Sequence, residues 1–213
     1  MTSAAWRPAA LFGGLLAIWI AIGSPIASLH HVLLSAHMLQ HLLLQSIAAP
    51  LLLLALPKGS TRSSSLFTHP LLCWLAATLV LTAWHIPAIF ELALHRQWLH
   101  QIERASFLGS GFLFWWPVIL PSSTTAWPRW SIPLYLFSAT LPCDVLSAFL
   151  SFCDRVVYRH YVSVPRVFGI SALQDQELAA ALMWVCVTLI YLIPAIVVSI
   201  EILSPRRLEA ISG

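Results

Sequence analysis

The sequence predicts an all-α protein, a polytopic transmembrane helical bundle of about six spans. Of its 213 residues, 59% are hydrophobic and only 9% are charged. The mean hydropathy is also high, at +0.84. Such a composition provides far more apolar surface than the core of a soluble protein of this length buries. Apolar stretches also recur at about the 20-residue length that a helix needs to cross a hydrocarbon layer of about 30 Å.

The loops between these stretches are short, so we expect a single transmembrane helical domain over residues 1–213. Polar segments such as LPKGSTRSSS and LHRQW leave no room for a second domain. No internal repeat with a period of about 20 to 50 residues is present, so we expect one bundle. The expected spans are residues 9–26, 30–56, 70–94, 98–120, 131–153 and 172–203.

The first stretch has two interpretations, a membrane span or a cleaved signal sequence. Arg7 precedes a short apolar run, and Ala21-Ile22-Gly23 is an acceptable cleavage site. With the N-terminus inside, six of the eleven Lys and Arg residues fall on the cytoplasmic side and five on the outer side. This small bias agrees with the positive-inside rule, so we expect a multi-pass protein with a cytoplasmic N-terminus.

The charge pattern argues against a nucleic-acid partner, and the cysteine spacing argues against a zinc or redox site. The net charge of +3 is spread over short loops without a basic run, so a nucleic-acid partner is not expected. The four cysteines stand far apart and form no CxxC pair, a pattern that fits buried thiols better than a zinc or redox site. They are Cys73, Cys143, Cys153 and Cys186.

The unusual polar residues of five stretches fall on one side of the membrane. This follows because helices in such a bundle alternate in direction, so the start of an even span and the end of an odd span share a face. The residues are His30, His31, His37 and His41; Trp84, His85 and Glu91; His100, Glu103 and Arg104; Asp144 and Asp154; and Asp175, Gln176 and Glu177. Ionisable groups in a bilayer are costly unless paired, hydrated or coordinated, so this cluster predicts a site. With the N-terminus inside, it faces the periplasm or the outside.

Helical spacing makes His37 and His41 the leading metal-ligand candidates. Two imidazoles at i and i+4 lie on one face of a helix and can bind one ion, although a hydrogen-bonded packing pair is the alternative. Imidazole together with the thioethers of Met38 or Met183 favours copper, especially Cu(I). The segment HMLQH lacks the glutamate of a zinc-protease motif. Gly109-Ser110-Gly111 is better explained by close helix packing than by a serine nucleophile.

Four segments carry a family resemblance: LSAHMLQHLLLQSIAAPLLLL, AWHIPAIFELAL, LHQIERASFLGSGFLFWWPV and DQELAAALMW. In this order they resemble the motifs of the CtaG family of bacterial membrane proteins, which are required for assembly of caa-type cytochrome c oxidases. The resemblance implies a respiratory-chain assembly factor of the bacterial inner membrane, and not an enzyme. The motif positions that carry over are His37, Met38, Gln40 and His41; Trp84, His85 and Pro87; His100 and Glu103; and Asp175, Gln176, Met183 and Trp184.

The chain departs from the family pattern at two positions. Glu103-Arg104 stands where the family implies Glu-His, and Ala180 stands where it implies Gly. Loss of that imidazole implies one ligand fewer, a different metal, or a guanidinium that binds Glu103 instead.

Our leading hypothesis is an assembly factor that binds or delivers copper at its extracytoplasmic face. The expected metal ligands are His37, His41, His85 and His100, with Met38 or Met183 as a soft, labile contact. Gln40, Glu103, Asp175 and Gln176 are expected to orient the imidazoles through hydrogen bonds. The expected partners are subunits of a haem-copper oxidase or a copper chaperone, together with membrane lipid.

Two other functions remain open at this point. A haem-binding electron carrier would pair one of His37 and His41 with His85 or His100 across the bundle as axial ligands. A metal or proton transporter needs an ionisable residue near the bilayer midplane and a path to both faces. Asp144 is the one candidate for that deep position.

Overall fold

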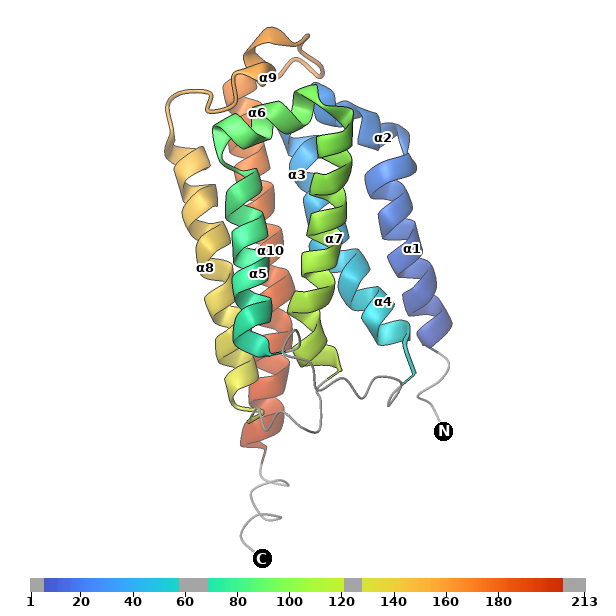
Figure 1. Ribbon diagram of the computed structural model, residues 1–213. Helices are drawn as coiled ribbons and strands as arrows, with labels where there is room; N and C mark the ends of the chain where they lie inside the picture. The colour runs from blue at the N-terminus through green and yellow to red at the C-terminus, as the bar shows by residue number, and fades with distance from the viewer. Residues whose placement is uncertain (1–5, 58–68, 121–127, 205–213) are drawn as a thin grey trace, which may run out of the picture.

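The computed structural model describes residues 6–57, 69–120 and 128–204, which fold into an upright bundle of helices without strands (Figure 1). The elements are α1 (Arg7–Gly23), α2 (Pro25–Ser28), the 3-10 turn η1 (Leu29–His31), α3 (Leu34–Leu42), the π-helical turn η2 (Leu43–Ala48), α4 (Ala49–Ala55), α5 (Pro70–Trp84), α6 (Pro87–His95), α7 (Gln97–Ile119), α8 (Ser131–Phe152), α9 (His160–Ser163) and α10 (Ala172–Leu203). The first residue of α1 and the last of α10 lie at the same end of the bundle.

The predicted fold class is confirmed. Among the described residues, three helical segments are long and apolar enough to cross a membrane by length and composition: Leu34–Ala55, Ser131–Phe152 and Ala172–Leu203. Two bent pairs, α1 with the α2–η1 segment and α5 with α6, raise that number to five. Helix α7 runs beside them but carries Glu103 and Arg104, which lower its hydropathy. Large apolar side chains cover the outside of the bundle, as lipid contact requires.

The third predicted stretch, 70–94, is divided into two helices that meet at 73°. Pro87 begins α6, and a proline disfavours helical geometry at the residue before it. Ile86 is accordingly extended, with φ −64° and ψ 122°. Helix α6 therefore lies across the upper end of the bundle in Figure 1. The bend leaves His85 at this end, directly after α5.

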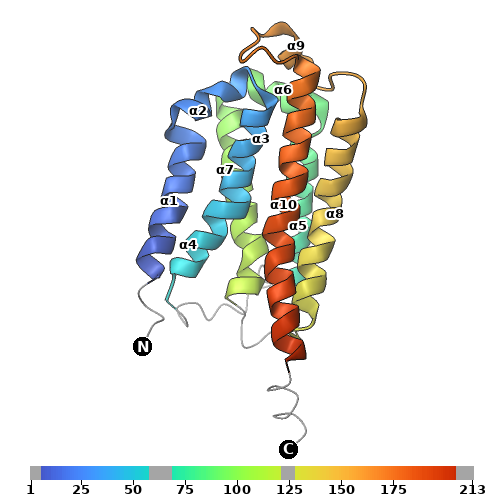
Figure 2. The same ribbon diagram turned by 180° about the vertical axis from the view of Figure 1, so that it is seen from behind.

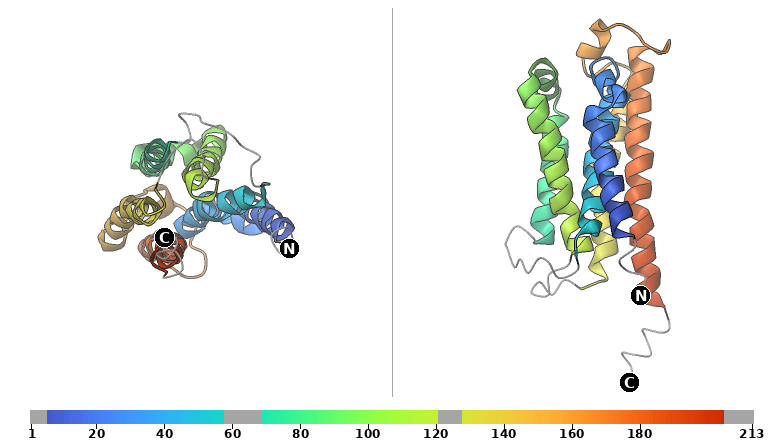
Figure 3. Two further views of the ribbon diagram at one scale, coloured as in Figure 1. Left: turned by 90° about the horizontal axis from the view of Figure 1, so that it is seen from below. Right: turned by 90° about the vertical axis from the view of Figure 1, so that its right-hand side faces the viewer.

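The rod formed by α3, η2 and α4 is the centre of the bundle and contacts α1, α7 and α10 (Figures 2 and 3). Its π-helical turn directly precedes α4, which carries Pro50 in its first turn. Proline clashes with the carbonyl four residues earlier in a regular helix, and a wider turn relieves that clash.

Gly111 allows α7 to pack closely against this rod. A Cβ atom at this position would lie 2.7 Å from the carbonyl oxygen of Gln45 and 2.9 Å from the Cβ of Ala49. The predicted packing role of the Gly109-Ser110-Gly111 segment is thus confirmed for Gly111. Gly109 differs, since a Cβ there would meet no atom within 4 Å.

Candidate metal centre

Histidines from three parts of the chain gather at the upper end of the bundle. His37 and His41 come from α3, His85 follows α5, and His100 comes from the first turn of α7. The ring centroid of His37 lies 4.5 Å from that of His41 and 5.5 Å from that of His100. The ring centroids of His41 and His85 are 6.2 Å apart. All four side chains are buried. The sequence-based expectation that these imidazoles meet at one end agrees with this arrangement.

His37, His41 and Glu103 form the tightest group. The Nε2 atoms of the two histidines are 2.8 Å apart, and the Glu103 Oε1 lies 3.2 Å from that of His37 and 3.3 Å from that of His41. Ligand atoms about 2.0–2.1 Å from a tetrahedral ion are separated by about 3.3 Å. Outward shifts of a few tenths of an ångström would therefore let these three atoms hold one ion. The sequence predicted a supporting role for Glu103, whereas its carboxylate lies within direct ligand distance.

The interior around this group lacks hydrogen-bond partners for several polar atoms. Glu103 Oε2 and the Nδ1 atoms of His37 and His41 are buried without a partner among the described residues. Phe107 stacks on His41 at 3.8 Å and Phe90 lies 4.7 Å from His37, so apolar rings replace water. Buried unpaired polar atoms are costly, and a bound cation is one way to offset that cost at Glu103.

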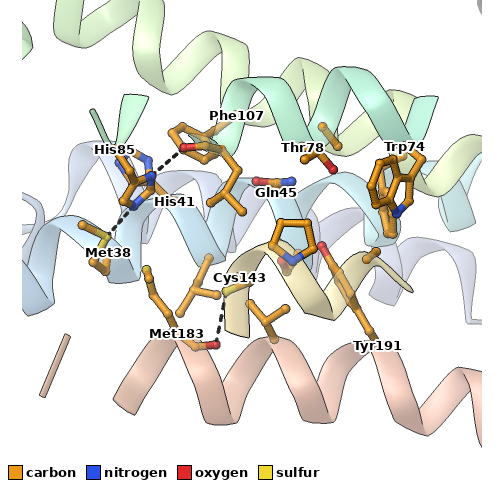
Figure 4. A pocket seen from close by; sticks show the side chains of 18 residues that line it. Met38, His41, Gln45, Trp74, Thr78, His85, Phe107, Cys143, Met183 and Tyr191 are labelled. Atoms are coloured by element: carbon orange, nitrogen blue, oxygen red, sulfur yellow. Dashed lines mark hydrogen bonds between the residues drawn. The ribbon is translucent and has the colours of Figure 1, made fainter. Parts of the chain in front are cut away.

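Met38 and His85 form a second potential ligand pair beside this group. The His85 Nδ1–H donates to the carbonyl of Leu81 at 2.7 Å, which assigns the proton to Nδ1 and leaves a lone pair on Nε2. That Nε2 faces the Met38 sulfur at 3.2 Å (Figure 4). Two electron-rich atoms thus face each other, and a soft cation suits them better than a proton. A metal-binding histidine commonly donates its other N–H to a carbonyl in this way.

A small cavity of about 50 Å³ extends from this pair toward the middle of the bundle (Figure 4). Met38, His41 and His85 line the end of the cavity at the left of Figure 4, and Trp74 and Tyr191 lie at the right. Its remaining lining includes Met183 and Cys143, whose thiol lies 4.0 Å from the Met183 carbonyl. The structure thus places Met183 beside the cluster through this cavity.

Asp175 and Gln176 bind backbone groups instead of imidazoles. The Asp175 carboxylate accepts hydrogen bonds from the N–H groups of Leu34 and Ser35 and from the Ser35 hydroxyl. Gln176 accepts from the N–H of Val157 and donates to two carbonyls of the α8–α9 region. Both residues therefore position chain segments around the cluster.

Gln40 and Arg104 lie next to each other, beside the group of His37, His41 and Glu103. Gln40 donates to the Ala27 carbonyl at 2.9 Å, and an Arg104 N–H donates to the Gln40 oxygen at 3.5 Å. His100 Nε2 lies 3.9 Å from Glu103 Oε2, farther than the nitrogens of the α3 histidines lie from Oε1 of the same carboxylate. His100 is thus adjacent to the tight group and outside it.

Tyr158 and Tyr161, which sequence reasoning did not single out, fasten the α8–α10 connection over the cluster. The Tyr158 hydroxyl donates to the His85 carbonyl at 3.0 Å and the Tyr161 hydroxyl to the His30 carbonyl at 2.8 Å. Burial raises the pKa of both phenols, so they remain protonated donors. Two tyrosines three residues apart in the run DRVVYRHYVSVPR were the available signal.

Fold and site together define a polytopic helical membrane protein with a buried histidine–glutamate cluster at one end. The sequence profile of the cytochrome c oxidase caa3 assembly factor family (Caa3_CtaG) matches residues 2–204. The chain belongs to this family, which confirms the resemblance seen in its motifs. Membership implies a role in oxidase assembly rather than in catalysis. Comparison with curated proteins and with solved structures gave no match.

Proposed function

We propose that the protein binds copper at His37, His41 and Glu103 and delivers it to a haem-copper oxidase during assembly. The observation that carries this proposal is the triangle of two imidazole nitrogens and one carboxylate oxygen with sides of 2.8, 3.2 and 3.3 Å. Membership of the oxidase assembly family supplies the biological setting. Copper is the cargo of this process, and an oxidase subunit or a copper chaperone is its partner.

The donor set supports copper over other metals. Two histidines and a carboxylate alone also suit zinc. The Met38 sulfur and the His85 lone pair, which lie beside the triangle, add soft donors that favour Cu(I). Arg104 adds a fixed positive charge near the anionic Glu103, so a monovalent ion meets less repulsion here than a divalent one.

The proposed location of the site is the extracytoplasmic side of a bacterial inner membrane. In Figure 1 the start of α1 and the end of α10 lie at the end of the bundle opposite to α6 and to the first turns of α3 and α7, which carry His37 and His100. With the N-terminus in the cytoplasm, the cluster lies near the periplasmic surface.

The two rival functions gain less support from the geometry. A haem needs room for a macrocycle between facing imidazoles, whereas the cavity beside His41 and His85 measures about 50 Å³. For a transporter, Asp144 would be the deep ionisable residue. Its carboxylate lies 3.5 Å from the Thr188 hydroxyl in the α8–α10 seam, and it does not line that cavity.

Metal analysis of the purified full-length protein tests the copper proposal. The wild type, incubated with copper and zinc and then desalted, is expected to retain copper, and the double variant His37→Ala/His41→Ala is expected to lose it. His95→Ala is the matched control, because this imidazole is exposed and lies outside the cluster. Equal copper in the double variant, or zinc in place of copper in the wild type, would refute the proposed site.

A cellular measurement tests the delivery step. Cells whose only copy carries His37→Ala/His41→Ala are expected to accumulate oxidase with reduced copper content, whereas the His95→Ala copy supports normal content. Full copper in the oxidase of the double-variant cells would show that the protein assists assembly without delivering metal through these residues.

A further inference from the structure

Three further imidazoles connect the triangle to the surface. His31 is exposed, whereas His30 and His100 are buried with 6% and 4% of their surface accessible. The ring centroids are 3.8 Å apart from His31 to His30 and 4.3 Å apart from His30 to His100. From His100 the next ring, His37, is stacked at 5.5 Å. The series thus runs without interruption from the exterior to the proposed copper site.

The buried rings of this series offer unused nitrogen atoms. The His30 Nδ1–H donates to the Ala27 carbonyl, which assigns the proton to Nδ1 and a lone pair to Nε2. That Nε2 and the Nε2 of His100 have no hydrogen-bond partner in the described part of the chain. Buried nitrogens of this kind are uncommon in folded proteins, and a passing cation would give them a partner.

We propose that His31, His30 and His100 form the loading route for the cation, with His30 and His100 holding it transiently before it reaches the triangle. This inference rests on the proposed function, because it assigns a path to the same copper ion. Cu(I) accepts imidazole ligands and tolerates low coordination numbers, so two nitrogens suffice for a short-lived stop.

Arg104 keeps the binding of the cation at His30 and His100 weak. Its guanidinium lies in the same region and acts electrostatically on His30, His31, His37 and His100. A like charge lowers the affinity of each ligand position for a cation. The carboxylate of Glu103 offsets this charge most at the triangle, where it lies 3.2 and 3.3 Å from the two imidazoles, and less at His100, which is 3.9 Å away. The affinity therefore increases from the surface toward the triangle, as a route that fills the inner site requires.

The backbone of the route is held independently of its imidazoles. The Tyr161 hydroxyl donates to the His30 carbonyl, and the His160 Nε2–H donates to the His31 carbonyl at 2.9 Å. Replacing the side chain of His30 or His31 leaves these bonds available. Variants at both positions are thus expected to fold, which makes a kinetic test practical.

The test measures how fast the full-length protein in detergent takes Cu(I) from a coloured bathocuproine complex. In His30→Ala, uptake and the reverse transfer to excess chelator are both expected to slow by about tenfold or more, with unchanged final copper content. His31→Ala is expected to slow uptake to a smaller extent. His95→Ala, exposed and outside the series, is expected to match the wild type.

The outcomes separate this inference from the function on which it rests. Wild-type uptake rates in both His30→Ala and His31→Ala would overturn the route while leaving the copper site intact. A lowered final copper content in His30→Ala at an unchanged rate would also overturn it, since His30 would then be a ligand of the site itself. Absence of copper from the wild type would refute the proposed function instead. Thermal unfolding of each variant checks folding, and His30→Gln replaces His30→Ala if the latter is unstable.

Discussion

The carboxylate of Asp175, in the first turn of α10, accepts a hydrogen bond of 2.6 Å from the backbone N–H of Leu34, the first residue of α3. Its second oxygen accepts from the N–H and the hydroxyl of Ser35. The first N–H groups of a helix have no partner within the helix, so Asp175 caps α3 from another part of the chain. The histidines of the proposed copper site follow within the next two turns of α3.

Replacing Asp175 with Ala is expected to lower the free energy of unfolding by about 1–3 kcal/mol, because it leaves buried N–H groups unpaired. Unfolding in detergent, followed by circular dichroism, measures the loss. Ser35→Ala removes one of the three bonds and is expected to have a smaller effect. Full stability of Asp175→Ala would contradict this capping role.

The sequence was sufficient for the apolar stretches and for the end at which the histidines meet, because both follow from hydropathy and from the alternating direction of spans. It did not give the division of the 70–94 stretch into α5 and α6. It was insufficient for the roles of Glu103 and Asp175. The rotation of α7 about its own axis decides whether Glu103 faces His37. That rotation depends on packing between helices, such as the contact of Gly111 with Gln45. The cap on α3 joins residues 141 positions apart, beyond any local pattern.

Glu103→Gln is expected to weaken copper binding by about tenfold or more, which corresponds to about 1.4 kcal/mol. The amide has the size of the carboxylate but lacks the negative charge that compensates the cation. Competition with a Cu(I) chelator gives the affinity. Glu103→Asp retains the charge and is expected to bind more tightly than Glu103→Gln. Equal affinities for the wild type and Glu103→Gln would exclude the carboxylate from the site.

Gly111→Ala is expected to destabilise the bundle by about 1–3 kcal/mol, because the added methyl group would overlap the backbone of Gln45. Gly109→Ala is a matched control in the same helix. Its methyl group meets no atom within 4 Å, so the higher helix propensity of alanine is expected to stabilise α7 by about 0.5–1 kcal/mol. Unfolding measurements on both variants give the two changes in stability. Changes of the same sign would contradict the close packing of Gly111 against Gln45.

Met38→Leu is expected to reduce the preference for Cu(I) over zinc while preserving the fold. Leucine fills a similar volume at this fully buried position, but it lacks the sulfur that faces the Nε2 of His85 at 3.2 Å. Parallel titrations with Cu(I) and Zn²⁺ give the ratio of affinities. Met183→Leu, which alters the same cavity without the contact to His85, serves as the comparison. An unchanged ratio in Met38→Leu would remove its thioether from the coordination of copper.

Arg104→His tests the position at which the chain departs from its family motif. The substitution removes a buried positive charge and adds an imidazole one residue from Glu103, so metal affinity is expected to rise, with the larger gain for divalent ions. Arg104→Gln separates the two effects, because it removes the charge without adding a nitrogen ligand. If charge dominates, both variants gain affinity equally.

If the new imidazole binds, only Arg104→His shows an additional nitrogen neighbour by X-ray absorption at the copper edge. A loss of affinity in both variants would mean that Arg104 holds Gln40 and α3 in place through the 3.5 Å contact, and that this positioning outweighs its charge.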